Sequence, residues 1–472
     1  MASIGRQLAQ FVDELKYESL PAHVVDKAKA LTLHFLAGAL EGYHTDDVQE
    51  AIQLIKHEER VAEGGSTILV DGTRVTKAGA AQVDDLMHHA IEDTYRMITH
   101  PGRSVFPGAF AVLEEAEATG EEFITAVVAG YEVQVRLTGE YPPSVMARGF
   151  HPGALFGIFG AAVAAAKLLR LDENQINSVL ALCVSLASGN AEGTKTRGRI
   201  PRESASVRNA MLAVLLARSG MRGGETSFEG EGGFYYSFIG NNQGRLKYVF
   251  KGPKLAPLEG ITAELGSRWE MLNTVHKIYP TGGYNGPHVD VMAGLCARRN
   301  IQPADVEHVE LVVNWLEAQV PDPAFPRAAS SEPRVGSTHY FSAYGIVKRG
   351  YPAARQWVGR DTSPEYADPP EVLDLMKRIR IIPSKRQTPF GPTIKVFTKD
   401  GKVHTARSTG REFMWDLAEQ TRRIPERLPP LPIPQSQFGD LVDAVHKLEH
   451  LLDAADLIRL TLKPETQSGR VE

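Results

Sequence analysis

Two histidines of this chain each stand directly before a Pro-Gly pair, and they are the first candidates for acid–base chemistry. His100 lies in the polar segment 88–108, and His151 comes just before an apolar segment that predicts a helix. A histidine just ahead of a helix N-terminus lies near the positive end of the helix dipole, which favours the neutral imidazole. His151 is therefore suited to act as a base or to donate a hydrogen bond, although a structural role fits the sequence equally well.

The segment that carries His100 is the densest cluster of polar side chains in the sequence. It also contains His88, His89, Glu92, Asp93 and Thr94. Because Pro101 restricts the backbone of His100 and Gly102 permits an open turn, we expect a helix to end at this point. A histidine at the end of a helix can face a cleft, and the alternative is a histidine that only caps a solvated helix end.

A basic loop follows in EGTKTRGRIPRES, between two helical segments. It carries Lys195, Arg197, Arg199 and Arg202. Guanidinium and ammonium groups held on one short loop can pair with carboxylates and orient them. The loop is therefore a candidate site for a substrate with several carboxylates, and the alternative is a solvated basic loop.

A fourth cluster surrounds a glycine-rich turn ahead of a predicted helix, in HKIYPTGGYNGPHVDVMAGL. It contains His276, Lys277, Tyr279, Tyr284 and His288. The backbone amides at the start of such a helix can bind an anion. We find no convincing metalloprotease, nucleophile-elbow, P-loop or dinucleotide-binding motif in the sequence.

The composition is that of a soluble globular protein of two to four domains, at about 150 residues per domain. The 472 residues include 52 Lys and Arg against 57 Asp and Glu, a net charge of −5, and no long basic run. We therefore expect neither nucleic acid nor a membrane as partner. Cys183 and Cys296 lie far apart without a CxxC motif, so we expect no metal site or iron–sulfur cluster.

The N-terminal residues have the spacing of an amphipathic helix rather than the continuous apolar core of a signal peptide. No stretch approaches 18 uninterrupted apolar residues, so we expect a cytoplasmic protein.

The hydrophobic pattern predicts mainly helices from residue 21 to about 265, and these helices must position the clusters. Within that range, 66–77 predicts two strands around an Asp71-Gly72 turn, and the glycine-rich segment 223–244 predicts an ordered loop. After Trp269 the pattern changes to that of an α+β domain.

The strands of this second domain are expected in 306–314, 378–384 and 392–408, the last around a Lys399-Asp400-Gly401 turn. From residue 412 the pattern is helical again, with a helix over 438–451, so we expect the C-terminal segment to return to the first domain.

Several segments resemble, in order along the chain, the family of 2-methylcitrate dehydratase and cis-aconitate decarboxylase, known as MmgE/PrpD. They are THPG (99–102), AGYEVQVRL (129–137), RGFHPGALFGIFGAAVAAAKLLRLDENQI (148–176), SLASGNAEGTKT (185–196), EGEGGF (229–234) and KIYPTGGY (277–284).

The resemblance implies a mainly α fold. It implies a large all-helical domain from residues 1–268 and 405–472, and a smaller α+β lid domain from residues 269–404 inserted between them. It also implies a homodimer and a cofactor-free site in the cleft between the domains that takes a small carboxylate substrate.

Carried over residue by residue, the resemblance implies catalytic roles for His100, His151, Lys195 and Tyr340. It implies substrate binding by Thr94 and Lys277, to which we add Arg197 and Arg199 of the basic loop.

Two positions depart from the pattern of the family. Ala90 stands where the family has an aspartate, although Glu92 and Asp93 occupy its last two acidic positions. Gly282 stands where we align the family's histidine of the second domain. The possible substitutes are Glu92, Asp93, His276 and His288, and the basic loop is also several residues longer than usual.

These observations favour a lyase of the dehydratase or decarboxylase type that acts on a small di- or tricarboxylate. The reactions of the family share a carbanion or enolate next to a carboxylate, made by a base and stabilised by cations. The alternatives are an epimerase or isomerase of a small dicarboxylate, since the family includes one that acts on iminodisuccinate, and a paralogue that binds a ligand without turnover.

Overall fold

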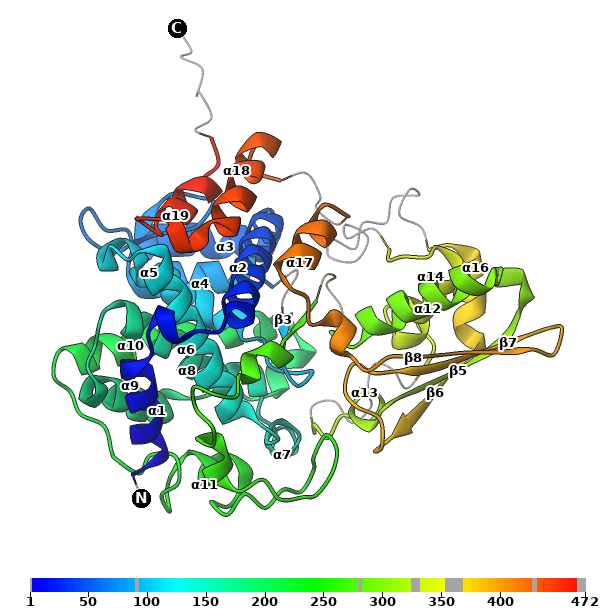
Figure 1. The fold of residues 1–472 in the computed structure, drawn as a ribbon, viewed down its shortest axis with the longest axis horizontal. Helices are drawn as coiled ribbons and strands as arrows, with labels where there is room; N and C mark the ends of the chain where they lie inside the picture. Colours follow the sequence, from blue (N-terminus) through cyan, green and yellow to red (C-terminus); the bar gives the residue numbers. More distant parts are fainter. Residues whose placement is uncertain are drawn as a thin grey trace, which may run out of the picture.

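The computed structural model describes residues 2–89, 93–277, 279, 282–323, 332–352, 368–426 and 431–464. A large helical body and a smaller part with the main sheet lie side by side, with the short strand β3 at the junction between them (Figure 1). The mainly α fold class predicted from the sequence is confirmed.

The helical body is built from both ends of the chain. Its α-helices are α1 (Ile4–Glu14), α2 (Ala22–Gly42), α3 (Asp46–Glu58), α4 (Lys77–Met87), α5 (Gly102–Ala116), α6 (Gly120–Thr138), α7 (Pro142–Met146), α8 (Pro152–Leu168), α9 (Glu173–Leu186), α10 (Ile200–Arg218), α11 (Phe234–Ile239), α17 (Leu417–Arg423), α18 (Gln435–His446) and α19 (Asp456–Thr461). One hydrophobic core includes side chains from Ile4 to Met271 and from Leu417 to Ile458. The C-terminal segment therefore returns to the first core, as expected.

Small residues let the central helices α5, α6 and α8 pack closely. A Cβ on Gly108 would lie 2.4 Å from the carbonyl oxygen of Ala161, and one on Gly160 would lie 2.0 Å from Oε1 of Gln134. Because neither position has room for a methyl group, the glycines set the distance between these helices.

The smaller part has its own core, formed by side chains from Tyr279 to Val396. Its α-helices in the described residues are α12 (Asn285–Arg299), α13 (Trp315–Ala318), α14 (Thr338–Val347) and α16 (Pro370–Leu375), and its strands there are β5 (Val306–Asn314), β6 (Ile379–Ser384), β7 (Thr393–Thr398) and β8 (Val403–Arg407). The exact boundaries of the two domains, after 268 and after 404, stay a prediction.

The strands form a sheet in the order β6-β5-β7-β8, in which β5 runs parallel to β6 and antiparallel to β7, and β7 runs antiparallel to β8. The expected turn joins β7 and β8, and Gly401 there has a φ of 79°, which glycine adopts without strain. The strands predicted in 306–314, 378–384 and 392–408 are thus confirmed.

Two short pairs of strands lie outside the main sheet. The expected strand-turn-strand consists of β1 (Ser66–Thr67) and β2 (Arg74–Val75). The second pair joins β3 (Asp93–Thr94) to β4 (Val275–His276), far apart in the sequence.

Two local expectations were wrong. The segment 223–244 is not only a loop, because it contains helix α11. The second concerns His100: helix α4 already ends at Met87, and α5 begins at Gly102. Pro101 and Gly102 therefore start a helix instead of ending one, as proline does well at a first helical turn, where its missing N–H costs no hydrogen bond.

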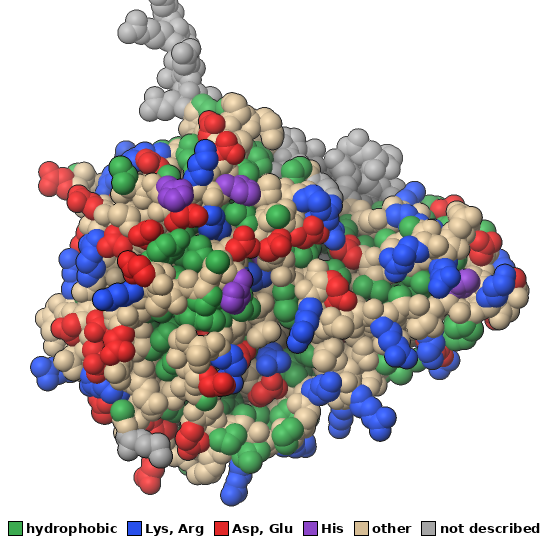
Figure 2. Space-filling model, in the orientation of Figure 1, with side chains coloured by type: hydrophobic (Ala, Val, Ile, Leu, Met, Phe, Trp, Pro, Cys, Tyr) green, Lys and Arg blue, Asp and Glu red, His purple; other side chains and the backbone are tan. Residues whose placement is uncertain are grey.

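The surface carries charges of both signs. Acidic and basic side chains are interspersed over the face in Figure 2, in keeping with the net charge of −5. Among the helices that the structure describes, none has the length and the apolar character that crossing a membrane would require.

Candidate active site

The candidate site lies where β3 of the helical body pairs with β4, the strand that leads into the smaller part. Asp93 lies opposite His276 and Thr94 lies opposite Val275. A Cβ on Gly283 would lie 2.9 Å from Cγ2 of Thr94, so the glycine-rich turn packs directly against Thr94. Two clusters that are about 180 residues apart in the sequence thus meet at one point.

Asp93 organises the entry to helix α5. Its Oδ1 accepts a hydrogen bond from the backbone N–H of Gly102 at 2.8 Å, and its Oδ2 accepts one from the Tyr131 hydroxyl at 2.9 Å. Its backbone oxygen lies 3.0 Å from Nδ1 of His100. A carboxylate at a helix N-terminus satisfies the orphan N–H groups there, so Asp93 holds His100 in place through the backbone.

His151 is the N-cap of helix α8, as the sequence predicted. Its backbone N–H donates to the carbonyl oxygen of Gly189 at 2.9 Å, and its Nδ1 lies 3.6 Å from Oε1 of Glu203. Burial lowers the pKa of His151 to about 3. Glu203 opposes this shift, while the positive charges of Arg202, His100 and Arg103 add to it, so His151 is a neutral imidazole near neutral pH.

An ion-pair network includes Glu203, the carboxylate next to His151. The guanidinium of Arg103 binds both carboxylate oxygens of Asp85, at 2.9 and 3.0 Å, and its Nη1 lies 3.4 Å from Oε2 of Glu203 and 3.0 Å from Nδ1 of His89. Arg103 and Asp85 are almost fully buried. A bidentate pair of this kind has a fixed geometry, which makes Arg103 a rigid support for Glu203.

A second buried group lies on the other side of the junction, around His276. Nζ of Lys27, on α2, donates to the carbonyl oxygens of Thr274 and Trp415 at 2.8 and 3.1 Å and lies 3.4 Å from Nδ1 of His276. The His276 ring stacks on the Trp415 ring, with 5.4 Å between the ring centres, and meets the His34 ring edge-on, with 5.1 Å between the centres. Lys27 thereby ties together the two places where the chain crosses between the parts.

The pKa values of this pair are both lowered. Burial lowers the pKa of Lys27 to about 7, against the opposing charges of Asp93, Asp26 and Asp416. Burial, with the charges of Lys27 and His34, holds the pKa of His276 well below its usual value, and a hydrogen bond to the backbone of Phe413 opposes this. His276 is therefore neutral.

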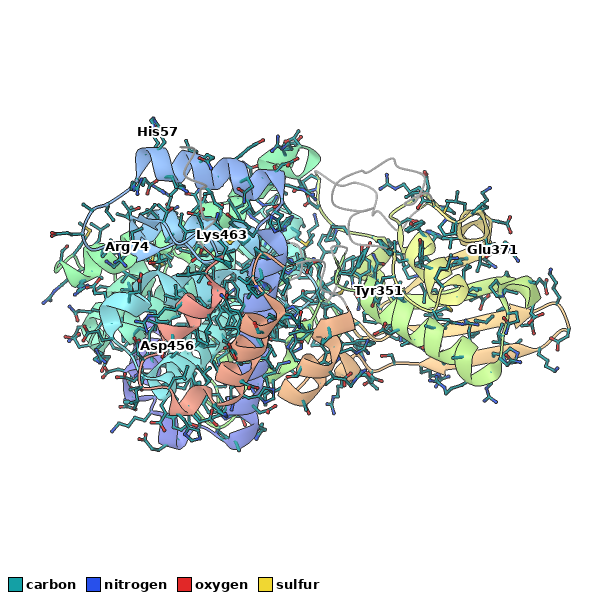
Figure 3. The ribbon with its side chains drawn as sticks, turned by 90° about the horizontal axis from the view of Figure 1, so that it is seen from above. His57, Arg74, Tyr351, Glu371, Asp456 and Lys463 are labelled. Carbon is teal, nitrogen blue, oxygen red and sulfur yellow. The ribbon has the colours of Figure 1, made fainter. Side chains whose placement is uncertain are left out.

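A small hollow opens beside His276. Its lining includes His276, Lys277, Gly286, Asp290, Tyr351 and Trp415. Figure 3 shows Tyr351 near the junction of the two parts, and its hydroxyl donates to the carbonyl oxygen of Gly286 at 3.1 Å. Lys277 is buried, so the hollow combines an ammonium group with the first turn of α12, and both favour a carboxylate.

The basic loop forms two 3₁₀ turns, η2 (Glu192–Lys195) and η3 (Arg197–Arg199), ahead of α10. The Lys195 side chain lies outside the described residues. Arg197 is exposed and pairs with Asp47 and Glu50 of α3, and Arg199 is exposed as well. Arg197 therefore already has carboxylate partners, and the substrate-binding role of both arginines stays a prediction.

Tyr340 and His288 lie in the interior of the smaller part. The hydroxyl of Tyr340 donates to Oδ1 of Asp368 at 2.5 Å, and burial together with this carboxylate raises the Tyr340 pKa. Nε2 of His288 lies 2.9 Å from Oε2 of Glu317, and both side chains are fully buried. Of the residues predicted for the site, His276 and Lys277 line the hollow, whereas Thr94, His100, His151, Tyr340 and His288 do not. Ala90 and Glu92 lie outside the described residues.

Three buried groups that the sequence analysis passed over belong to this neighbourhood: Glu203, Arg103 and Lys27. The sequence could have indicated Lys27, because a lysine amid the apolar residues of a long helix must find polar partners. For Glu203 the indication was weaker, that of an acidic residue directly after four basic ones. Arg103 follows THPG, and only its tertiary contacts reveal its partners.

The arrangement provides a neutral imidazole next to a carboxylate, a second histidine at the start of the neighbouring helix α5 and a buried lysine across the junction. A neutral imidazole can accept a proton, and a cation beside a bound carboxylate can stabilise negative charge that develops next to it. Among the residues that the structure describes, no group of three or more His, Cys, Asp or Glu could hold a metal ion.

Comparison with known proteins gives three informative relatives. The cis-aconitate decarboxylase-like protein oryM of Aspergillus oryzae is 28% identical over 298 residues, which are 60% of this chain and 60% of that relative. The cis-aconitate decarboxylase of Mus musculus is 23% identical over 501 aligned positions, 99% of this chain and 95% of the relative. That of Homo sapiens is 26% identical over 244 residues, half of each chain.

The chain thus spans less than two thirds of the Aspergillus oryzae relative and nearly all of the Mus musculus one. The model of the MmgE/PrpD N-terminal domain matches residues 6–247, which include His100, His151 and Glu203. With about half of its length matched by that model, the chain belongs to the MmgE/PrpD family.

Proposed function

We propose that this protein is a lyase that acts on a small tricarboxylate or dicarboxylate, with His151 and His100 as base and acid. The observation that carries the proposal is the placement of these two histidines at the starts of α5 and α8, two helices that pack against each other. They come from the N-termini of two different helices, and the charge of His100 acts on the protonation of His151. Two imidazoles in one site can divide the two proton transfers of an elimination between them, and a decarboxylation needs only the one that donates a proton to the carbanion.

The substrate class follows from the cations and from the relatives. Lys277 lines the hollow at the junction, and Lys195 belongs to the loop ahead of α10. We assign both to binding substrate carboxylates and the negative charge that develops beside them. The relatives named above are cis-aconitate decarboxylases or resemble one, so cis-aconitate is the first substrate to test.

In either lyase reaction the electron pair of a breaking bond must be stabilised next to a carboxylate. Loss of carbon dioxide leaves a carbanion that takes up a proton, while loss of water begins with removal of a proton next to a carboxylate and ends with protonation of the leaving hydroxyl. We assign the acceptor role to His151, because its imidazole is neutral, and the donor role to His100.

An epimerase is the second candidate. The observation that favours it is the pair of departures at Ala90 and Gly282, where the chain lacks groups that its family uses. An epimerase needs removal and return of a proton on one carbon, but no leaving group, so it makes fewer demands on the site.

One experiment separates these reactions. The protein is incubated with cis-aconitate and a panel of other di- and tricarboxylates in deuterated water and followed by NMR. Loss of carbon dioxide or water supports the lyase, and deuterium exchange without net loss supports the epimerase. Silence with the whole panel contradicts both and favours a protein that binds without turnover.

A further inference from the structure

Glu203 lies directly against the ring of His151. It comes from the first turn of α10, and α10 packs against α8, whose N-cap is His151. Oε1 of Glu203 lies 3.6 Å from Nδ1 of His151, and Glu203 is buried. This separation is longer than a hydrogen bond, and Nδ1 makes no hydrogen bond among the described residues, so Glu203 acts on the ring through its charge.

Gly153 makes room for this contact. A Cβ at position 153 would lie 2.8 Å from Oε2 of Glu203 and 3.0 Å from Cε1 of His151. The second residue of the Pro-Gly pair therefore has to be small because the carboxylate and the imidazole close over it. The site is built around the Glu203–His151 contact.

Two guanidinium groups lie beside the Glu203 carboxylate. Nη1 of Arg103 lies 3.4 Å from its Oε2, and Nη2 of Arg202 lies 4.0 Å from its Oε1. Arg103 is in turn locked by its two contacts to Asp85, and Arg202 donates to Oγ1 of Thr194 at 2.6 Å. Two guanidinium groups favour the ionised carboxylate, and an ionised carboxylate can only accept hydrogen bonds.

We propose that Glu203 is a positioning residue that holds His151 in the tautomer with its proton on Nδ1, which leaves Nε2 as the base. A neutral imidazole has one N–H, and the nitrogen that faces an ionised carboxylate is the one that carries it. When Nε2 takes up a proton, Glu203 stabilises the imidazolium. The expected effect of this tautomer on turnover rests on the proposed function. The tautomer itself does not depend on it.

Within the described part of the chain, the charged groups that act most on His151 are Glu203 and Arg202 on α10, Arg103 on α5, and His100. Of these, Glu203 is the one with negative charge. Its removal therefore takes away the negative charge that favours a proton on Nδ1 and stabilises the imidazolium.

The test is to measure the tautomer directly. The full-length protein is labelled with ¹⁵N-histidine, and the ring signals of His151 are assigned by their loss in His151→Asn. We expect the wild type to show Nδ1–H and Glu203→Gln to show a rise of the Nε2–H form. Glu114→Gln is the matched control, because it removes one carboxylate that also pairs with an arginine, Arg74, at 2.8 Å, away from the site.

Turnover gives the second readout. We expect Glu203→Gln to lower kcat by about 10- to 10³-fold and to change KM by less than about threefold, because binding groups are untouched. Glu203→Asp keeps the charge and should retain the Nδ1–H tautomer and recover part of kcat.

An Nε2–H tautomer in the wild type overturns the proposal, as does an unchanged tautomer in folded Glu203→Gln. If Glu203→Gln does not fold, the tautomer of His151 in the wild type and in Glu203→Asp still tests the proposal. If no carboxylate reacts with the wild type, the proposed function fails, while the tautomer of His151 is measured independently of any substrate.

Discussion

The surroundings of His151 and of His276 differ in the sign of the charge beside the ring. Both histidines are neutral because burial lowers their pKa. His151 faces a carboxylate, Glu203, whereas His276 faces an ammonium group, Lys27. Glu203 favours a proton on His151, against burial and the positive neighbours, whereas Lys27 disfavours a proton on His276. Of the two rings, His151 is therefore the one with a carboxylate to stabilise its imidazolium.

The comparison also separates two kinds of junction. Around His151 the contacts join helices of a single core, α5, α8 and α10. Around His276 they join the two crossings between the parts, since Lys27 binds the backbone at both Thr274 and Trp415. The first junction orients a side chain, and the second holds the two parts together.

The largest expected effect comes from replacing the two histidines in turn. His151→Asn should lower turnover by about 10²- to 10⁴-fold, the usual range for a positioned acid or base, and His276→Asn by about tenfold or less. Deuterium exchange into the substrate that reacts is the measurement, with melting temperatures to show that both variants fold. Equal losses would remove the distinction drawn between the two rings.

The next effect concerns Lys27 and the dependence of stability on pH. In the folded protein its pKa is about 7, against 10.5 for an unburied lysine, so the unfolded chain holds this proton up to higher pH. Folding stability should therefore rise as pH increases from about 7 to 10, by several kcal/mol, since each pKa unit is worth about 1.4 kcal/mol.

Lys27→Met should flatten this rise, and unfolding measured across that pH range checks it. Lys16→Met, at an exposed position, is the control that should keep the wild-type slope. A wild-type stability that falls over the same range would contradict a buried lysine with a lowered pKa.

A smaller effect is expected at the ion pair that joins α17 to α12. Nη2 of Arg423 lies 3.2 Å from Oδ2 of Asp290, and the guanidinium lies 5.0 Å from the centre of the Trp415 ring. Arg423→Gln should lower stability by about 1 kcal/mol, because the pair is only partly buried. A thermal unfolding scan measures the change, and a loss several times larger would mean that this pair dominates the second junction.

The smallest effect is expected at Arg197. Its exposed guanidinium already pairs with Asp47 and Glu50, so Arg197→Gln should change KM by less than about twofold and barely affect stability. Substrate titration of the variant checks this. A large rise in KM would return Arg197 to the substrate-binding role that the basic loop indicated in the sequence.

Much of the fold could be predicted because its patterns are local. The alternation in 306–314 predicts β5, and the Pro-Gly step after His151 predicts the start of α8. The same step after His100 was misread as the end of a helix, since Pro-Gly permits a break as well as a start. The tertiary structure explains why the chain is extended at Asp93 and Thr94. These two residues form β3, which pairs with β4 about 180 residues away.

The sequence by itself determined most of the helices, the strands of the main sheet, which family the chain resembles and that His100 and His151 are candidates for chemistry. The tertiary structure decided which charge each histidine faces. Glu203, Arg103 and Lys27 come from helices distant in sequence from the rings they serve, and no periodicity links them. Protonation depends on burial and on charges within a few ångströms, and those distances exist only once the helices have packed.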